Sequence, residues 1–369
     1  MNNRHQINPF TKILFLCLFF YCRISAQQIP NTICFYYNWF GSKAIDGDNY
    51  HWKHPVMPEN DKDTTTKLFL GNGDIGANYF PELGEYSSAD SIVVKTHMQQ
   101  LAKAGFSIVA VTWLGESDYT YKSLPLIFKY AAESNLKVCF QIEPCVRKTT
   151  MMTVQQMIFI INQFGNEKSF YRDETTKKPL FFVYDSYMID AVEWNKVLGN
   201  NSDELKFRKT KYDSDVIGLF CWKEDTAFFQ KAGFDGMYTY FASRGFTYGA
   251  NPDNWNYLNA FAKNNNLKFI PSVGPGYNDN RIRPWNKKNT KDREKGRYYD
   301  RFFEDAIKCK LDWIAVTSFN EWHEGTQIEP AQSYQFKDAL YLDYEGRPND
   351  YYITRTKYWL NSWNLSKIK

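Results

Sequence analysis

Several features are scarce or missing in this sequence of 369 residues, and each absence excludes a class of protein. There are only five histidines and seven cysteines, and no two cysteines form a C-x-x-C pair. Neither a cysteine-based zinc site nor a dense disulfide framework is therefore indicated. The net charge is only +4 and no run of basic residues is dense, which argues against a nucleic-acid partner. No apolar run reaches the roughly 20 residues that a stable membrane span needs.

The N-terminus has the pattern of an export signal. A basic start precedes a short apolar stretch at residues 13–21, and Ser25 and Ala26 offer small residues at which cleavage would occur. We predict a signal peptide over residues 1–26 and a catalytic domain over residues 27–369. The protein is then expected to be exported, and to be periplasmic, on the cell surface or secreted.

Cysteine usage leaves two alternatives for that N-terminus. Cys22 lies just before the expected cleavage point, so a lipid-anchored form and a short signal-anchor both remain open. The cysteines that would remain after cleavage are Cys34, Cys139, Cys145, Cys221 and Cys309. Their odd number and wide spacing favour buried thiols over a disulfide framework.

Eight short runs rich in β-branched and aromatic residues recur along the chain, and we expect them to be strands. They span residues 32–39, 106–113, 137–144, 179–186, 215–222, 234–241, 267–274 and 311–322. Segments with helical character lie between them, for example residues 91–105, 123–135 and 253–265. Nearly continuous hydrophobicity is typical of parallel strands that are covered on both faces. The pattern predicts an α/β protein with a single (β/α)8 barrel and a long excursion, residues 40–90, after the first strand.

An open, doubly wound sheet is the competing architecture, but it usually begins with a glycine-rich phosphate turn, whereas the first run here ends in YYNWFGS. In a barrel of this kind the active site lies at the C-terminal ends of the strands. Aromatic and acidic residues gather at those ends: Tyr36, Tyr37, Trp39, Trp113, Glu143, Tyr184, Asp185, Trp222, Tyr238, Tyr240, Glu321 and Glu324. Aromatic residues make up 18% of the chain, and their faces stack on sugar rings, so the pattern favours a carbohydrate-binding cleft.

The segment VTSFNEWHEGTQIEP, residues 316–330, carries the chemistry that we consider first. A metal site is not indicated, because no second histidine stands four residues from His323, and we expect neither a metal nor a cofactor. A helix cap is disfavoured by Gly325 and Pro330. Because the segment continues a buried strand, Glu321 is expected at the mouth of the barrel rather than on a solvated outer loop.

An acid–base site fits the segment best. Glycoside hydrolysis needs one protonated carboxyl at the leaving oxygen and one ionised carboxylate near the anomeric carbon. We expect burial beside Trp322 to raise one pKa while a polar neighbour keeps the other low. Glu143 is a third acid on the same face, and spacing leaves open which two of the three carry out the reaction.

In several segments the chain resembles a known family, the glycoside hydrolase family 99 endo-α-mannosidases and endo-α-1,2-mannanases. The segments that carry the resemblance run in order from about residue 34 to residue 344: FYYNWFG, HWKHPV, DIGANYFPELGEYSS, VYDSY, AGFDGMYTYFAS, FIPSVGPGYNDNRIRPWN, TSFNEWHEGTQIEPA and LYLDY. The resemblance implies a (β/α)8 barrel. It also implies retaining, endo-acting cleavage of an α-1,2-linked mannose that carries glucose or mannose at its 3-position.

The resemblance further implies a mechanism without a covalent enzyme intermediate. Glu321 would remove the proton from the sugar's own 2-hydroxyl, which attacks the anomeric carbon to form a 1,2-anhydro sugar. Glu324 would act as the general acid and then as the base for water. The residues expected to bind the sugars are Glu143, His54, Tyr240, Trp113, Tyr37, Tyr184 and Trp322. The expected partner is α-mannan or a high-mannose N-glycan oligosaccharide.

One position departs from the family pattern. Leu114 stands where an aromatic residue would face the outermost sugar, so no preference between glucose and mannose carries over. The short export signal favours bacterial degradation of mannan or N-glycans. The alternatives are a secretory-pathway enzyme that trims glucosylated N-glycans, a non-catalytic carbohydrate-binding barrel, and a double displacement with Glu321 as nucleophile and Glu143 as acid.

Overall fold

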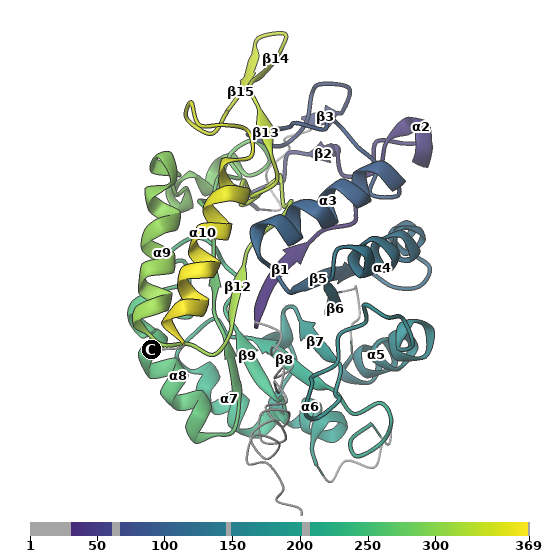
Figure 1. Cartoon of the computed structure of the whole chain (residues 1–369), viewed down its shortest axis with the longest axis vertical. Helices are drawn as coiled ribbons and strands as arrows, with labels where there is room; N and C mark the ends of the chain where they lie inside the picture. Colours follow the sequence, from purple (N-terminus) through teal and green to yellow (C-terminus); the bar gives the residue numbers. More distant parts are fainter. Residues whose placement is uncertain (1–30, 61–66, 145–148, 201–206, 368–369) are drawn as a thin grey trace, which may run out of the picture.

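Parallel strands form the centre of the molecule (Figure 1). The computed structural model describes residues 31–60, 67–144, 149–200 and 207–367. The central sheet consists of β1 (Thr32–Tyr36), β5 (Ile108–Trp113), β6 (Lys137–Ile142), β7 (Leu180–Val183), β8 (Asp215–Leu219), β9 (Gly236–Tyr238), β10 (Lys268–Ile270), β11 (Ser272–Val273) and β12 (Ile314–Val316). Each of the eight expected runs contains part of this sheet, so the predicted barrel is confirmed.

The sheet closes into a barrel because the expected strand at residues 267–274 is divided into β10 and β11, which lie at opposite ends of the strand order. The strand order is β10-β9-β8-β7-β6-β5-β1-β12-β11, and only Pro271 separates β10 from β11. Proline has no N–H to donate and interrupts a ladder. Consequently β10 pairs with β9 on one side and β11 pairs with β12 on the other.

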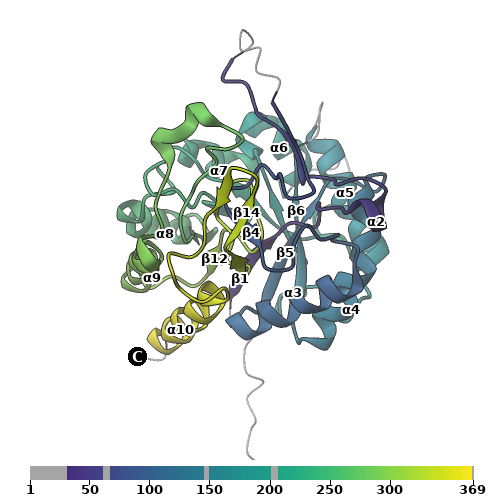
Figure 2. The same cartoon turned by 90° about the horizontal axis from the view of Figure 1, so that it is seen from above.

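Helices form the outer layer around the strands (Figure 2). They are α3 (Ser91–Ala104), α4 (Leu124–Glu133), α5 (Thr150–Phe164), α6 (Ala191–Leu198), α7 (Asp225–Ala232), α8 (Trp255–Asn264), α9 (Arg297–Lys308) and α10 (Tyr351–Ser366). The start and stop of α3 illustrate the local rules. Asp90 caps its N-terminus by accepting from the N–H groups of Ile92 and Val93, and Gly105 ends it in the left-handed conformation.

Small elements gather at the end of the barrel toward which β1 points (Figure 1). Between β1 and α3 lie α2 (Lys43–Asp46), β2 (Lys53–Pro55), β3 (Leu68–Leu70) and β4 (Phe80–Pro81), and after β12 come β13 (Ala331–Gln332), β14 (Tyr334–Phe336) and β15 (Ala339–Tyr341). β4 pairs antiparallel with β13. The segment before α3 is therefore tied to the chain that leaves the last barrel strand.

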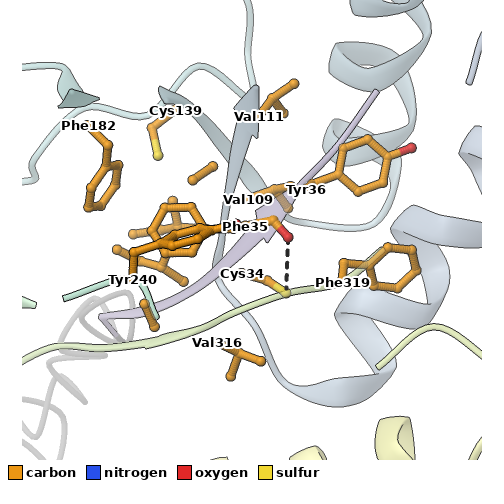
Figure 3. Packing of buried hydrophobic residues seen from close by; sticks show 14 of the residues in the cluster. Cys34, Phe35, Tyr36, Val109, Val111, Cys139, Phe182, Tyr240, Val316 and Phe319 are labelled. Atoms are coloured by element: carbon orange, nitrogen blue, oxygen red, sulfur yellow. Dashed lines mark hydrogen bonds between the residues drawn. The ribbon is translucent and has the colours of Figure 1, made fainter. Parts of the chain in front are cut away.

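Aromatic side chains fill the barrel interior, which accounts for part of the high aromatic content. The ring centroid of Phe35 in β1 lies 5.3 Å from that of Phe182 in β7 and 5.4 Å from that of Tyr240, and both pairs are edge to face (Figure 3). Such edge-to-face pairs add stabilisation beyond the area they bury. The core thus reaches up to Tyr240, a residue of the predicted site.

The cysteines behave as expected where the structure describes them. Cys34, Cys139, Cys221 and Cys309 are buried free thiols, and Cys145 lies outside the described residues. The expected signal peptide, residues 1–26, also lies outside them. No helix in the described part of the chain is long and apolar enough to cross a membrane.

Candidate active site

The loop between β12 and β13, residues 317–330, folds back on itself at the mouth of the barrel. The amide of Ser318 donates to the carbonyl of Thr326 at 3.0 Å, and the amide of Ile328 returns to the carbonyl of Ser318 at 3.0 Å. The hydroxyls of Ser318 and Thr326 also share a hydrogen bond of 2.9 Å. These hydrogen bonds join the two ends of the loop, and Glu321 and Glu324 lie in the turn between them.

Gly325 allows the turn to pass close to a neighbouring segment. Its φ is +63°, and a Cβ there would lie 2.8 Å from the carbonyl oxygen of Asn278. A side chain would meet both backbone strain and a clash. In the actual structure the amide of Asn278 donates to the carbonyl of Glu324 at 2.8 Å. Glycine at this position therefore lets a second loop hold the backbone of Glu324.

The loop is anchored from below by Glu329, which is completely buried. One carboxylate oxygen accepts from the Tyr86 hydroxyl at 2.7 Å and from the Trp322 indole N–H at 3.0 Å. The other lies 3.1 Å from Nε2 of His97 on α3, whose Nδ1 lies 3.0 Å from the Tyr36 hydroxyl. A buried carboxylate needs such donors, since an unpaired one would be very costly.

The Glu321 carboxyl is held in a nearly closed pocket, with 5% of the residue exposed. Its backbone N–H donates to the Ser318 hydroxyl at 2.7 Å, and its Oε1 accepts from the backbone N–H of His323 at 3.2 Å. Burial raises the pKa of Glu321 well above its usual value, and the charge of Glu324 adds to this. The two carboxyls therefore act on one another electrostatically.

Arg283 lies against the Glu324 carboxyl. Its Nη1 is 3.5 Å from Glu324 Oε1 and 3.3 Å from Asp279 Oδ2. Asp279 is itself fixed, because Oδ2 accepts from the Tyr277 hydroxyl and from Asn286 Nδ2, each at 2.8 Å. Burial raises the pKa of Glu324, while Arg283 opposes that rise.

The expected separation of the two pKa values is not what the structure has. We expected one carboxyl to be raised and the other to stay low, but burial raises the pKa of both Glu321 and Glu324. Two carboxylates confined to one buried site resist being charged together. Burial of Glu321 and the nearby charge of Glu324 thus favour keeping one proton on the pair.

Tyrosine hydroxyls bring the third acid into the same site. The phenols of Tyr37 and Tyr240 share a short hydrogen bond, and Tyr240 has a φ of +48°, which is rare for a residue with a side chain. Burial raises the pKa of Tyr37, and the charges of Glu143 and Glu321 raise it further. Burial, followed by the charge of Glu324, raises the pKa of Tyr184.

Glu143 stands at the end of β6 beside an apolar recess. Its Oε1 accepts from Gln141 Nε2 at 2.6 Å and lies 3.4 Å from the Thr112 hydroxyl. The recess is open to solvent and is lined by Trp113, Leu114, Gly115, Ile142, Glu143, Met152, Thr153 and Gln156. The indole N–H of Trp113 donates to Gln156 Oε1 at 2.7 Å, which orients this wall.

His323 lies beside Glu321, with its Nδ1 3.8 Å from Glu321 Oε1, and two further histidines lie near the His323 ring. The His323 ring lies 4.5 Å from the His54 ring and 6.4 Å from the His51 ring, and His51 stacks on Trp39 at 4.6 Å. Burial lowers the pKa of all three, well below the usual value for His323 and to about 4 for His51. The imidazoles are therefore neutral at pH 7. Within the described residues, no group of histidine, cysteine and acidic side chains is arranged to hold a metal ion.

The structure places most of the predicted site residues close together. One of them, Trp322, is buried and does not line the cleft. Glu321, Glu324, Glu143, Tyr37, Tyr184, Tyr240 and His54 are linked by the contacts and charges described above. Trp322 has no exposed surface, and its indole points to Glu329 and Tyr86. We expected it to bind sugar, but the burial corrects this: Trp322 holds the loop.

Arg283, Asp279 and Glu329 were missed by the sequence reasoning. The first two lie in the segment FIPSVGPGYNDNRIRPWN, which carries part of the family resemblance. Nothing in the sequence spacing indicates that this segment lies next to Glu324. Glu329 follows in the same loop as the two acids. Only the fold shows that it points inward rather than to the cleft.

Comparisons with known proteins agree with this geometry. A family model described as glycosyl hydrolase family 99 matches residues 29–365. A mouse glycoprotein endo-α-1,2-mannosidase is 39% identical over 347 residues, which cover 90% of this chain and 75% of the mouse protein. The solved structure of a GH99 endo-α-mannosidase from Bacteroides thetaiotaomicron is 43% identical, with a TM-score of 0.88 over 91% of this chain and 98% of that one.

Glu329→Gln should destabilise the fold and reduce activity. The amide would place an N–H₂ group among donors that need an acceptor, and a buried hydrogen-bonding group left unsatisfied costs about 1–3 kcal/mol. Urea unfolding of this variant, compared with the exposed-site control Glu133→Gln, measures the effect. An unchanged free energy of unfolding for Glu329→Gln would show that the Glu329 network does not anchor the loop.

Proposed function

Because the chain belongs to glycoside hydrolase family 99 and is a glycoside hydrolase, we propose that it is a retaining, endo-acting α-1,2-mannosidase. Its substrate is a glycan with a 3-O-substituted, α-1,2-linked mannose, from which it releases Man-α1,3-Man or Glc-α1,3-Man. The observation that carries this proposal is the pairing of a buried Glu321 with a partly exposed Glu324 in one turn, near Tyr37, Tyr240 and Arg283. A sugar-binding barrel without catalysis is not favoured, because the family is one of hydrolases.

The reaction runs in two steps through the sugar's own 2-hydroxyl. Glu321 takes the 2-hydroxyl proton as that oxygen attacks the anomeric carbon, and Glu324 gives its proton to the departing glycosidic oxygen. The product on the enzyme is a 1,2-anhydro sugar. Glu324 then takes a proton from water, which opens the anhydro ring at the anomeric carbon, and Glu321 returns its proton to the 2-oxygen. Two inversions give net retention.

The electrostatics of the two carboxyls support the assignment of Glu321 as the base and Glu324 as the acid. The mechanism needs one proton on the two carboxyls together, and burial raises the pKa of both. A glycosidic oxygen can only accept a hydrogen bond, whereas a 2-hydroxyl can donate one. Bound substrate therefore favours the proton on Glu324 and the charge on Glu321. The nearby Arg283 stabilises the carboxylate that Glu324 becomes before the second step.

The remaining polar and aromatic groups form the sugar-binding surface. We assign sugar contacts to Glu143, His54, Tyr37, Tyr184 and Tyr240, which surround the carboxyl pair. Trp113 lines the recess beside Glu143 together with Leu114. Leu114 presents a branched aliphatic side chain instead of an aromatic ring, so this wall by itself assigns no preference between glucose and mannose in the outermost unit.

The biological setting that we propose is the breakdown of α-mannan or high-mannose N-glycans by an exported bacterial enzyme. This proposal is supported by the expected export signal and by the 43% identity to the Bacteroides enzyme over 98% of that chain. Trimming of glucosylated N-glycans in a secretory pathway is the second candidate. It is favoured by the 39% identity to the mouse glycoprotein endo-α-1,2-mannosidase.

A comparison of two substrates decides between these settings. We expect the purified protein to cleave a tetrasaccharide ending in Man-α1,3-Man-α1,2 in preference to one ending in Glc-α1,3-Man-α1,2. Product analysis by chromatography gives the ratio of the two kcat/KM values. Preference for the glucosylated substrate would favour the trimming enzyme, and failure to cleave either would overturn the proposed function.

Glu321→Gln and Glu324→Gln should each lower kcat by ~10²–10⁴-fold or more, because each carboxyl transfers a proton in the transition state. A substrate with an activated aryl leaving group separates their roles. It needs no proton from Glu324 in the first step, so Glu324→Gln should recover part of that step and Glu321→Gln should not.

The matched control is Glu304→Gln on the exposed face of α9, which should keep the wild-type rate. Circular dichroism checks that each variant is folded. Wild-type rates for either Glu321→Gln or Glu324→Gln would remove that residue from the mechanism. Equal recovery of both variants on the aryl substrate would reverse or merge the assigned roles.

A further inference from the structure

Arg293 is a buried cation directly behind the 317–330 loop. It lies between β11 and α9, and only 3% of the residue is exposed. Among the described residues, no carboxylate lies within ion-pair distance of its guanidinium. An arginine side chain remains charged in a protein, and an unpaired buried charge is very costly. The surrounding groups must therefore offset that cost in another way.

Three tyrosine rings enclose the guanidinium. Its carbon lies 4.7 Å from the ring centroid of Tyr79, 4.8 Å from that of Tyr344 and 4.5 Å from that of Tyr352. Each distance is within the range of a cation–π interaction, which strengthens when the cation is desolvated. The guanidinium Nε and Nη1 have no hydrogen-bond partner in the described part of the chain. The ring faces thus replace water around this side of the cation.

The remaining nitrogen is bound to the loop that carries the two acids. Nη2 donates to the carbonyl of Gly325 at 2.9 Å and to the carbonyl of Gln327 at 2.7 Å. These carbonyls flank Thr326, whose amide donates to the carbonyl of Glu321 at 3.3 Å. A single nitrogen therefore clamps the turn immediately after Glu324. Hydrogen bonds from a charged donor are roughly twice as strong as neutral ones.

The tyrosines come from three separate parts of the chain. Tyr79 precedes β4, Tyr344 follows β15, and Tyr352 lies in the first turn of α10. Tyr344 has a second contact with the loop, because its hydroxyl donates to the carbonyl of Glu329 at 2.5 Å. The C-terminal segment is thus connected through Arg293 and Tyr344 to both limbs of the turn that presents Glu321 and Glu324.

We propose that Arg293, caged by Tyr79, Tyr344 and Tyr352, is a positioning residue for the reaction: it clamps the Gly325 and Gln327 carbonyls and so fixes the direction of the Glu324 carboxyl. The inference rests on the proposed function of Glu324. Arg293 does not touch the substrate, and it acts only through the backbone of the loop. A displacement of about 1 Å in a catalytic group can cost ~10²-fold in rate.

The test compares Arg293→Met, Arg293→Lys and Tyr352→Phe with the wild type. Arg293→Met keeps an apolar stem in the cage but loses the donors, and should lower kcat by about 10- to 100-fold while KM changes less than about threefold. Arg293→Lys keeps the charge but not the planar, forked donors, and should recover only part of the rate. Tyr352→Phe keeps the ring face but removes a hydroxyl that interacts with the guanidinium, and its kcat should lie between those of Arg293→Met and the wild type.

Measurements are made on folded protein, well below each variant's melting temperature, with the pH dependence of kcat/KM recorded for each. We expect at least one limb of the Arg293→Met profile to move, because the displaced loop alters how Glu321 and Glu324 interact. A lower melting temperature with wild-type kcat and an unmoved pH profile would mean that Arg293 only packs the core, and would overturn the inference.

If Arg293→Met does not fold, Tyr352→Leu is tested instead. This variant removes one of the three tyrosine rings around the guanidinium and keeps the guanidinium itself. The same reduction in kcat and movement of the pH profile are then expected, and an unchanged profile contradicts the clamp. Failure of the proposed function is distinguishable, because the wild type itself would then release no disaccharide from either tetrasaccharide. Failure of the present inference requires a wild type that is active.

Discussion

The buried carboxylate of Glu329 is the constraint on which the active site depends. It collects donors from the segment before α3, from α3 itself and from the loop that carries Glu321 and Glu324, through Tyr86, His97 and Trp322. Without these donors a fully buried carboxylate would be too costly to keep. With them it joins three segments far apart in the sequence. The position of the Glu321–Glu324 turn follows from this junction.

A fixed loop explains how two like carboxyls can be kept together. Asn278 and Arg293 hold the backbone on either side of Gly325, and Asp279 holds Arg283 against Glu324. These contacts are made within the protein, so they require no reorganisation when substrate arrives. Burial raises the pKa of both acids; the charge of Glu324 adds to this for Glu321, and the charge of Asp279 adds to it for Glu324. In the proposed mechanism, the substrate's own hydrogen-bonding groups decide which carboxyl holds the proton.

Sequence periodicity and strand composition were sufficient to predict the barrel and the face on which the acids gather. All eight strand runs were identified, although the break at Pro271 and the closure it allows became visible only in the pairing. Glu143 directly follows β6, and Glu321 and Glu324 lie in the loop after β12, so all three could be selected from their positions alone. Trp322, Glu329 and Arg293 could not be interpreted in this way. Whether such a side chain faces the cleft or the core depends on how the 317–330 loop folds back. That depends on contacts with residues far away in the sequence, such as Tyr37, 283 positions from Asn320.

In the mechanism that we propose, the two carboxyls of one turn act through the sugar's 2-hydroxyl, and the sugar forms no covalent bond to the enzyme. The most direct test is to incubate the protein with an aryl disaccharide whose reacting mannose carries fluorine in place of that hydroxyl, and to measure the intact protein by mass spectrometry. We expect an unmodified mass and no release of the aryl group, because the attacking oxygen is missing. A mass increase equal to the glycosyl unit, located on Glu321, would contradict this mechanism and establish a double displacement instead.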